Sequence, residues 1–381
     1  MASYEQLSKY NWKVTVSLGF NADGKRIRER KQGFRTKKDA EKWCTEMLNR
    51  KHKGYIAPIE SNIKFKDFVI KWFDEYKQNT LSVNTRANYK SRINTHIIPK
   101  LGHLKLDKIT NIVVQDFYNT LINEGQKPSS AKKILETLNN CLRYAYKNKL
   151  IFNLPIDIDT ISIEKPKISF WNKEQVDFFL NEIKDTYLYT PVFIELLVGL
   201  RIGELCGLRW CDINLKEKYL IVSNQVLNDK TSKQLIFTDK LKTSTSYRKI
   251  TLPQVLVDYL KSIKGNALDT DFVILNREGK MCSPRNLSMN FSNIVKKFKL
   301  SSKDLVDSKK KFKNYMQLPQ ITFHGLRHTH ATLLIFNGEN IKVVSERLGH
   351  KSITETLDTY THVMDDMKNN TADLLDNIFA R

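Results

Sequence analysis

The sequence has few of the features expected of a secreted or membrane protein. It contains five cysteines, an odd number, and none of them lies in a C-x-x-C pair. This pattern excludes a regular disulfide framework and gives no sign of a zinc site. No segment approaches the roughly 18 uninterrupted apolar residues of a membrane-spanning helix, because the best run, residues 191–200, contains Glu195. The first ten residues are polar and have no apolar signal core. We therefore expect a reduced, cytoplasmic compartment.

Acidic residues are clearly fewer than basic ones. Lys and Arg number 63 against 41 Asp and Glu, which gives a net charge of +22. So much positive charge repels itself, so we expect a polyanionic partner, with nucleic acid as the first candidate. The length of 381 residues predicts two or three domains. A hydrophobic content of 41% is enough to bury a core and excludes global disorder.

Residues 1–55 form a basic segment with 14 Lys/Arg and 6 Asp/Glu, a net charge of +8. Residues 12–18 alternate with period two, residues 21–24 suit a hairpin turn, and Thr36 starts a capping box for a helix. We predict two or three strands plus one helix. The basic residues of this segment could simply protect an exposed edge strand from pairing with other chains. Because so many of them lie in a short hairpin, we favour contact with DNA. The candidates are Lys25, Arg26, Arg28, Arg30, Lys31 and Arg35.

Residues 63–156 show helical periodicity and predict a four-helix domain, in which Pro99 ends the second helix. Its aromatic residues are expected in the core. Residues 157–169 follow neither period and include Pro166, so they predict a linker. The helical domain has a basic surface, which is only weak evidence for DNA binding. The cations proposed to contact DNA there are Arg86, Lys90, Arg92 and Lys132.

Residues 170–381 predict a third domain of mixed, mainly helical structure. It begins with helices and continues with three short strands, after which the chain is helical to its end. The expected helices cover 173–184, 191–200 and 203–208, and the expected strands cover 219–223, 234–238 and 248–252. The tail, residues 365–381, has an apolar stripe at four-residue spacing, formed by Leu374, Leu375, Ile378 and Phe379. The fold class is therefore multidomain α+β, with a small antiparallel sheet in the third domain.

Three short segments of the third domain contain arginine, histidine and tyrosine residues that could form a catalytic site. They are G-L-R-I-G-E-L at 199–205, H-G-L-R-H-T at 324–329, and L-G-H at 348–350 followed by Tyr360. Each also has an ordinary explanation. Arg201 could cap a helix, His324 and Arg327 could be surface polarity one turn apart, and Gly349 could end a helix. Tyr360 could belong to the core.

Together these segments resemble the tyrosine recombinases, the phage-type integrase family, whose pattern is G-L-R-x-x-E-L, H-x-L-R-H-T, L-G-H and a tyrosine. The resemblance covers essentially the whole chain and is nearest to integrases of conjugative transposons. It implies that 1–55 is an arm-DNA-binding domain, that 63–156 is a core-DNA-binding domain, and that 170–381 is catalytic with a C-terminal tail helix.

The resemblance implies a site-specific recombinase that integrates and excises a mobile element. Strands would be cut and rejoined through a 3′-phosphotyrosyl intermediate and a Holliday junction, with no cofactor and no ATP. The enzyme would act as a homotetramer on core and arm sites of double-stranded DNA in a bacterial cytoplasm. Accessory DNA-bending or excision factors are possible further partners.

The resemblance also assigns roles to individual residues. Arg201 and Arg327 would clamp the phosphodiester and stabilise its transition state without a metal. Tyr360 would be the nucleophile, and His324 would help to remove its proton. Lys242, placed in a turn between the second and third strands, would protonate the departing 5′-oxygen. The remaining matches are His350, which would hydrogen-bond the phosphate, and Glu204, which would support the site from behind.

One departure and three alternatives remain. Many family members have Asp where this chain has Gly325. His324 and His328 could instead be metal ligands, although the segment lacks the acidic residue of H-E-x-x-H. A DNA-relaxing type IB topoisomerase would use the same chemistry without pairing two sites. A DNA-binding regulator that never cleaves would keep the basic surfaces, but it has no need of the six catalytic residues.

Overall fold

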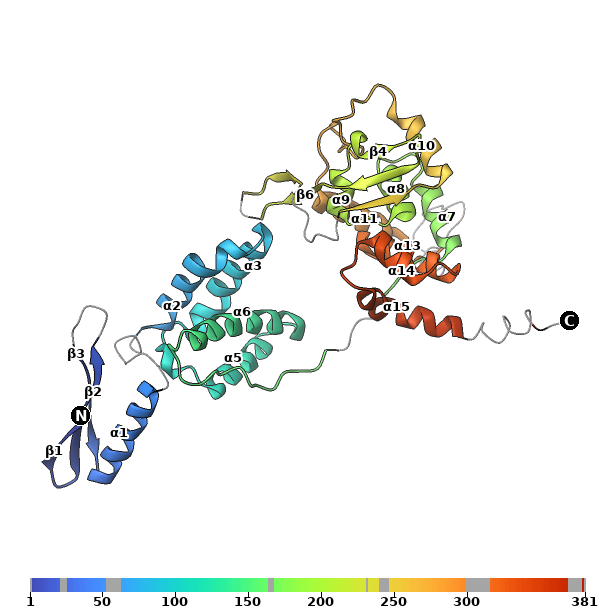
Figure 1. Ribbon diagram of the computed structural model, residues 1–381. Helices are drawn as coiled ribbons and strands as arrows, with labels where there is room; N and C mark the ends of the chain where they lie inside the picture. Colours follow the sequence, from blue (N-terminus) through green and yellow to red (C-terminus); the bar gives the residue numbers. More distant parts are fainter. Residues whose placement is uncertain are drawn as a thin grey trace. The chain divides into compact units, whose positions relative to one another are not determined.

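The computed structural model describes residues 2–20, 26–52, 63–163, 168–230, 232–239, 247–298, 316–368 and 379 (Figure 1). The chain divides into two compact units, Met1–Lys165 and Pro166–Arg381. The division falls inside the segment predicted as a linker, while the exact domain boundaries stay predictions. In the part of the chain described here, no helix is long and apolar enough to cross a membrane.

The N-terminal part of the first unit is a three-stranded antiparallel sheet with one helix. The strands β1 (Ala2–Ser8), β2 (Asn11–Phe20) and β3 (Arg26–Phe34) lie in the order β1-β2-β3, and α1 (Lys37–His52) follows. The alternation in β2 buries Val14 and Val16 against Ala40 and Cys44 of α1. Thr36 and Asp39 exchange the hydrogen bonds of the predicted cap. The predicted turn at 21–24 lies outside the described residues.

Residues 65–147 of the first unit are mainly helical and belong to a separate core. Phe65, Val69, Ile97 and Leu121 are completely or almost completely buried in it. The segments are α2 (Phe65–Lys71), π-helix η1 (Trp72–Lys77), 3-10 helix η2 (Gln78–Thr80), α3 (Val83–Arg92), π-helix η3 (Ile93–Ile97), α4 (Ile98–Leu101), 3-10 helix η4 (Leu106–Lys108), α5 (Asn111–Asn123) and α6 (Pro128–Lys147).

The expected end of the second helix at Pro99 is wrong by two residues. The chain passes from α3 through η3 into α4, which continues to Leu101. Pro99 lies in the first turn of α4, where the missing N–H costs no hydrogen bond within that helix. The adjoining π-helical turn shifts the hydrogen-bond pattern just before the proline. A proline therefore does not stop the chain from remaining helical here.

Within the described residues, the second unit is mainly helical and contains two small antiparallel sheets. Its elements are α7 (Lys173–Glu182), α8 (Tyr189–Val198), α9 (Ile202–Gly207), η5 (Trp210–Asp212), β4 (Ile213–Asn214), β5 (Tyr219–Val222), β6 (Gln225–Asn228), β7 (Leu235–Thr238), β8 (Arg248–Thr251), α10 (Gln254–Lys264), α11 (Pro284–Val295), η7 (Lys296–Phe298), α13 (Phe323–Phe336), α14 (Ile341–Leu348) and α15 (Ile353–Lys368). The predicted mixed α+β class is confirmed.

The strands of this unit pair differently from the predicted hairpin. One sheet has the order β4-β5-β8, and the other contains β6 and β7. β7 and β8, which correspond to the second and third predicted strands, belong to separate sheets. The segment that connects β7 to β8 includes Lys242, within residues 240–246. It therefore links two sheets and does not close a single hairpin. Those seven residues are outside the described part of the chain.

The described residues of the second unit form two apolar clusters. The larger contains Trp171, Phe179, Phe291 and Phe323, all almost fully buried. The smaller joins the last three helices through Ala331, Ile335, Val344, Leu348 and Tyr360. The predicted tail stripe lies outside the described residues, apart from the exposed Phe379.

Candidate active site

Two helices of the second unit end at glycines in the left-handed conformation. α8 ends at Gly199 with φ 72°, and α14 ends at Gly349 with φ 69°. This backbone conformation suits glycine, which has no Cβ. Gly199 is also closely packed, because a Cβ there would lie 2.5 Å from Cδ2 of His330. The last carbonyls of both helices need donors from elsewhere, and arginine side chains supply them.

Arg327 joins the two helix ends. Its Nη1 donates to the carbonyl of Gly199 at 2.7 Å and its Nη2 to the carbonyl of Leu348 at 2.6 Å. The residue is 2% exposed. Burial, followed by the charges of Arg201 and Arg248, lowers the pKa of Arg327 to about 10. The guanidinium therefore stays charged at neutral pH, in an orientation fixed by two carbonyls.

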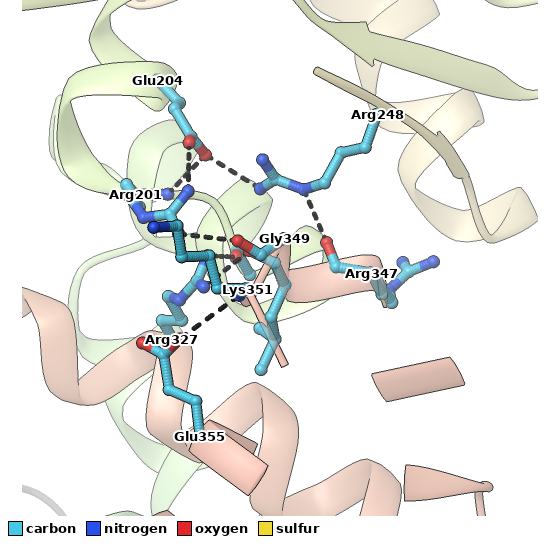
Figure 2. A network of polar contacts seen from close by, with 10 residues as sticks. Arg201, Glu204, Arg248, Arg327, Arg347, Gly349, Lys351 and Glu355 are labelled. Carbon is cyan, nitrogen blue, oxygen red and sulfur yellow. Dashed lines mark hydrogen bonds and ion pairs between the residues drawn. The ribbon is translucent and has the colours of Figure 1, made fainter. Parts of the chain in front are cut away.

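Arg201 is both a helix cap and a member of this cluster. It is the N-cap residue of α9, and its Nη1 donates to Oε1 of Glu204 at 2.8 Å. Its Nη2 donates to the carbonyl of Gly349 at 2.8 Å (Figure 2). The side chain remains 32% exposed. The helix-capping role expected for Arg201 and its proposed role in binding phosphate are therefore compatible.

Glu204 is shared by two arginines. Its second oxygen accepts from the backbone N–H of Arg201 at 3.0 Å and from Nη2 of Arg248 at 2.8 Å. Nε of Arg248 donates to the carbonyl of Arg347 at 2.7 Å, as Figure 2 shows. Burial alone would raise the pKa of Glu204, but the charge and hydrogen bond of Arg248 overcome it, so the pKa is lowered. Glu204 is therefore an ionised carboxylate behind the arginines.

Two arginines of this network, Arg248 and Arg347, were missed from the sequence. Arg248 begins β8, and Arg347 directly precedes the L-G-H segment. Arg347 donates to the carbonyls of Leu197 at 2.9 Å and Thr251 at 3.0 Å, and to Nε2 of His330 at 3.2 Å. Both arginines lie close in sequence to the segments that resemble the family motifs, and this proximity could have suggested a role in the site. It could not show which carbonyls they reach.

Tyr360 is buried and contacts a histidine. Its hydroxyl lies 2.8 Å from Nδ1 of His328, and the tyrosine is 1% exposed. Burial raises the pKa of Tyr360 above its ordinary value, although Arg327 partly opposes this shift. Among the hydrogen bonds of the described residues, the hydroxyl of Tyr360 is therefore paired with His328. The family resemblance had instead suggested His324 as the histidine that helps to remove its proton.

The two neighbouring histidines are held in their neutral form. The rings of His324 and His328 meet edge to face with centroids 4.7 Å apart. Desolvation, followed by the charge of Arg327, lowers the pKa of His324 to about 4, although part of the His324 residue is exposed to solvent. Burial, followed by His324, lowers the pKa of His328 to about 4. Both rings are therefore uncharged near pH 7.

His350 adjoins the same cluster from the end of α14. Its Nδ1 lies 2.7 Å from Oγ1 of Thr356 in α15. Burial, followed by the charge of Arg327, lowers the pKa of His350 to about 4. Neutral imidazole has one N–H, so the partner of one nitrogen decides what the other can do.

A buried acid lies behind the arginines. Glu195 is 1% exposed, and its Oε2 has no hydrogen-bond partner among the described residues. Burial raises the pKa of Glu195 well above its ordinary value, against the influence of Arg327. Glu195 is therefore harder to ionise than an exposed glutamate.

The structure also accounts for the departure from the family pattern at position 325. A Cβ on Gly325 would lie 2.7 Å from Cβ of Ile321. A larger residue would need Ile321 to shift. Glycine therefore fits the local packing of α13. In the part of the chain described here, no group of three or more His, Cys, Asp or Glu side chains could hold a metal ion.

The predicted DNA-contacting cations occupy several different environments. Arg28 and Arg30 are exposed, and they pair with Ser17 and Thr15 on the face of the sheet opposite Val14. Arg26, Arg35, Arg86 and Lys90 are also exposed, whereas Lys132 is half-buried. Lys25 and Lys242 lie outside the described residues.

Two of these predicted cations make structural contacts. The Lys31 ammonium lies 5.3 Å from the ring centroid of Phe34 and 5.9 Å from that of Trp43. Arg92 donates to Oγ1 of Thr137 at 3.2 Å and so connects α3 to α6. Their roles in DNA binding stay predictions.

Comparison with known proteins identifies three matching segments. Residues 170–367 match the family described as "Phage integrase family". Residues 64–122 match "Phage integrase, N-terminal SAM-like domain", and residues 4–51 match "Arm DNA-binding domain". The three matches follow one another in the order expected from the sequence.

Full-length relatives and solved structures agree with these matches. The chain is 27% identical to a tyrosine recombinase XerC-like protein of Caldanaerobacter subterraneus subsp. tengcongensis, over 99% of this chain and 98% of that protein. It is 27% identical to the ICEBs1 integrase of Bacillus subtilis, over 99% and 100%.

Among solved structures, the Tn1549 transposon integrase in complex with transposon right end DNA has a TM-score of 0.67 at 20% identity, covering 84% of this chain and 100% of that one. A lambda integrase tetramer bound to a Holliday junction has a TM-score of 0.54 at 19% identity, over 92% and 96%. At these identities the structures show a shared fold. Since the first match alone spans residues 170–367, more than half of the chain, the protein belongs to the phage integrase family.

Proposed function

We propose that this chain is a tyrosine recombinase that integrates and excises a mobile element at specific DNA sites. The observation that supports this best is the convergence of Arg201 and Arg327 on the ends of α8 and α14. Two guanidinium groups at one place are suited to bind the non-bridging oxygens of a phosphodiester. Tyr360 belongs to the apolar cluster that packs beside the same helix end.

The charge of the cluster suits a phosphate undergoing substitution. Arg201, Arg248 and Arg327 surround one ionised carboxylate, Glu204. Each terminal nitrogen of Arg327 has two N–H groups, and the carbonyl bonds recorded here use one on each. The arginines therefore supply fixed positive charge that stabilises the additional negative charge of the five-coordinate phosphorus.

In the proposed reaction Tyr360 attacks the phosphorus. A bond forms between its oxygen and the phosphorus, and the bond to the 5′-oxygen breaks. The tyrosine proton passes to a histidine, and we propose His328 because its Nδ1 is in contact with the hydroxyl. Lys242 is proposed to protonate the departing 5′-oxygen. Attack by a 5′-hydroxyl of another strand reverses each step, so no ATP is needed.

His324 and His350 have supporting roles in this proposal. His324 packs its ring against His328, and so limits where that ring can turn. His350 hydrogen-bonds the phosphate, as the family resemblance implies. Glu204 holds Arg201 and Arg248 from behind.

We also propose the DNA partners of the other parts. The sheet face with Arg28 and Arg30 suits contact with arm DNA, since α1 covers the opposite face. The exposed Arg86 and Lys90 of α3 suit the core site. Assembly as a tetramer on a Holliday junction, as in the lambda integrase structure, is proposed for this chain too. An accessory DNA-bending factor and a bacterial cytoplasmic location complete the proposal.

The test is covalent capture on nicked DNA containing the end of the element. Wild-type protein should become attached to a DNA 3′-phosphate, and peptide mapping should place the bond at Tyr360. Tyr360→Phe, which keeps the ring but removes the nucleophilic oxygen, should give no adduct and should bind DNA with nearly unchanged affinity. An adduct on another residue, or cleavage by the variant at the wild-type rate, would contradict the proposal. A recombination assay with two sites then distinguishes a recombinase from a DNA-relaxing enzyme.

A further inference from the structure

Two hydroxyl groups on one face of α15 contact two histidines of the site. Thr356 and Tyr360 are one helical turn apart, and they are 0% and 1% exposed. Tyr360 contacts His328, and Oγ1 of Thr356 lies 2.7 Å from Nδ1 of His350. Tyr360 has a role in the proposed reaction, whereas Thr356 has none so far.

Thr356 behaves differently from Thr359 and Thr361, two other threonines of its helix. Thr359 donates to the carbonyl of Glu355 at 2.6 Å, and Thr361 donates to the carbonyl of Leu357 at 2.6 Å. This bond to the residue four positions earlier is the usual one for a threonine within a helix. For Thr356, the hydrogen bond recorded among the described residues is with His350.

The direction of that hydrogen bond follows from burial. Thr356 is fully buried, and a buried hydroxyl proton without an acceptor is costly. Among the hydrogen bonds of the described residues, Nδ1 of His350 is the recorded partner of this hydroxyl, so we assign the threonine as donor and Nδ1 as acceptor. Since the lowered pKa favours neutral His350, its single ring proton then resides on Nε2.

We propose that Thr356 is a positioning residue that fixes the tautomer and orientation of His350 for binding the scissile phosphate. This inference rests on the proposed function, in which His350 donates to a phosphate oxygen. An Nε2–H donates to that oxygen, whereas a lone pair on Nε2 would repel it. Thr356 therefore prepares the ring as a donor before DNA binds, and the ring need not exchange its proton between nitrogens in the complex.

The experiment compares Thr356→Val with Thr356→Ser. Valine keeps the branched shape and removes the hydroxyl, and serine keeps the hydroxyl. We expect Thr356→Val to form the covalent adduct on nicked DNA roughly 3- to 10-fold more slowly, the loss expected for one hydrogen bond. Thr356→Ser should restore most of the rate. DNA affinity should stay near wild type in both variants. Thr361→Val, in which an exposed threonine on the same helix is changed, is the matched control and should react at the wild-type rate.

A double-mutant cycle separates positioning from general weakening of the fold. In a His350→Ala background, Thr356→Val should slow adduct formation no further, because the residue it positions is absent. Independent, multiplying losses would overturn the inference. So would equal rates for wild type and Thr356→Val, or equal slowing of the valine and serine variants with a lower Tm. If wild type forms no adduct at Tyr360, the proposed function fails instead, so the two failures are distinguishable.

Discussion

The arginines Arg28 and Arg30 of the N-terminal sheet and the buried arginines of the second unit are used in opposite ways. Arg28 and Arg30 in the N-terminal sheet are exposed on the face opposite α1. In the second unit, Arg248 is 8% exposed and Arg327 is 2% exposed, and both donate hydrogen bonds at fixed positions. Arginine therefore provides positive charge in the N-terminal sheet and hydrogen-bond donors of fixed orientation in the second unit. A phosphate backbone can be contacted by mobile cations, whereas a transition state requires donors that are already oriented.

The largest effect is expected for a change in a buried arginine. Arg327→Lys keeps a positive charge but cannot donate to the carbonyls of Gly199 and Leu348 together. We expect covalent adduct formation to fall by about 10²- to 10³-fold, the loss typical of removing an oriented transition-state donor. DNA affinity should change little. The measurement is single-turnover cleavage of nicked DNA, with gel-shift affinity as the control. A lysine variant that cleaves within a few-fold of wild type would show that charge alone is sufficient.

A second prediction tests how strongly the buried network depends on its carboxylate. Glu204→Gln removes the negative charge between Arg201 and Arg248, and loss of one partner in a buried pair typically costs about 3 kcal/mol or more. We expect the free energy of unfolding at neutral pH to fall by that order, as measured by urea denaturation. Since the pKa of Glu204 is lowered on folding, its contribution is complete above the ordinary value of 4.5. The contribution is lost as pH falls through the lowered value.

The difference between wild type and Glu204→Gln should therefore be largest near neutral pH and should shrink in acid. A difference that grows as the pH falls would contradict the assignment of an ionised carboxylate. Glu346→Gln, in which an exposed glutamate of the same unit is changed, is the control and should have little effect on unfolding.

The exposed arginines give a smaller and different prediction. Arg28→Gln combined with Arg30→Gln should weaken binding to arm DNA. If both side chains contact phosphates, the log–log dependence of affinity on salt should become less steep by roughly two units. Arg28→Lys with Arg30→Lys should retain most of the affinity, because charge is sufficient there. An unchanged salt slope in the glutamine variant would remove this face from the DNA interface. Lysine variants as defective as the glutamine ones would show that these arginines also act through geometry.

The smallest expected effect is that of a chelator. If Arg201 and Arg327 supply the positive charge, cleavage of nicked DNA should continue at an unchanged rate in excess EDTA. Loss of cleavage with EDTA and its recovery with zinc or magnesium would instead favour metal binding at His324 and His328. The contact between His328 and Tyr360 favours the first outcome, since that histidine already has a polar partner.

Much of the molecule follows from short-range features of the sequence. The alternation in residues 12–18 predicts β2, the three- and four-residue spacing from Phe65 predicts α2, and the motif glycine Gly349 marks the end of α14. The pairing of Arg201 with Glu204 is local as well, since the two are three residues apart. Such features depend on neighbours within a turn or a strand, so the sequence by itself determines them.

The tertiary structure decided what those residues contact. Arg201 reaches a carbonyl 148 residues away, Arg327 one that is 128 residues away, and Arg248 one that is 99 residues away. His328, rather than His324, contacts Tyr360, and Thr356 contacts His350. Side-chain spacing cannot show these partners, because a free helix-end carbonyl attracts any cation that packing brings near it. The sequence by itself determined which chemical groups are present, and the packing of α8, α13, α14 and α15 decided which of them meet.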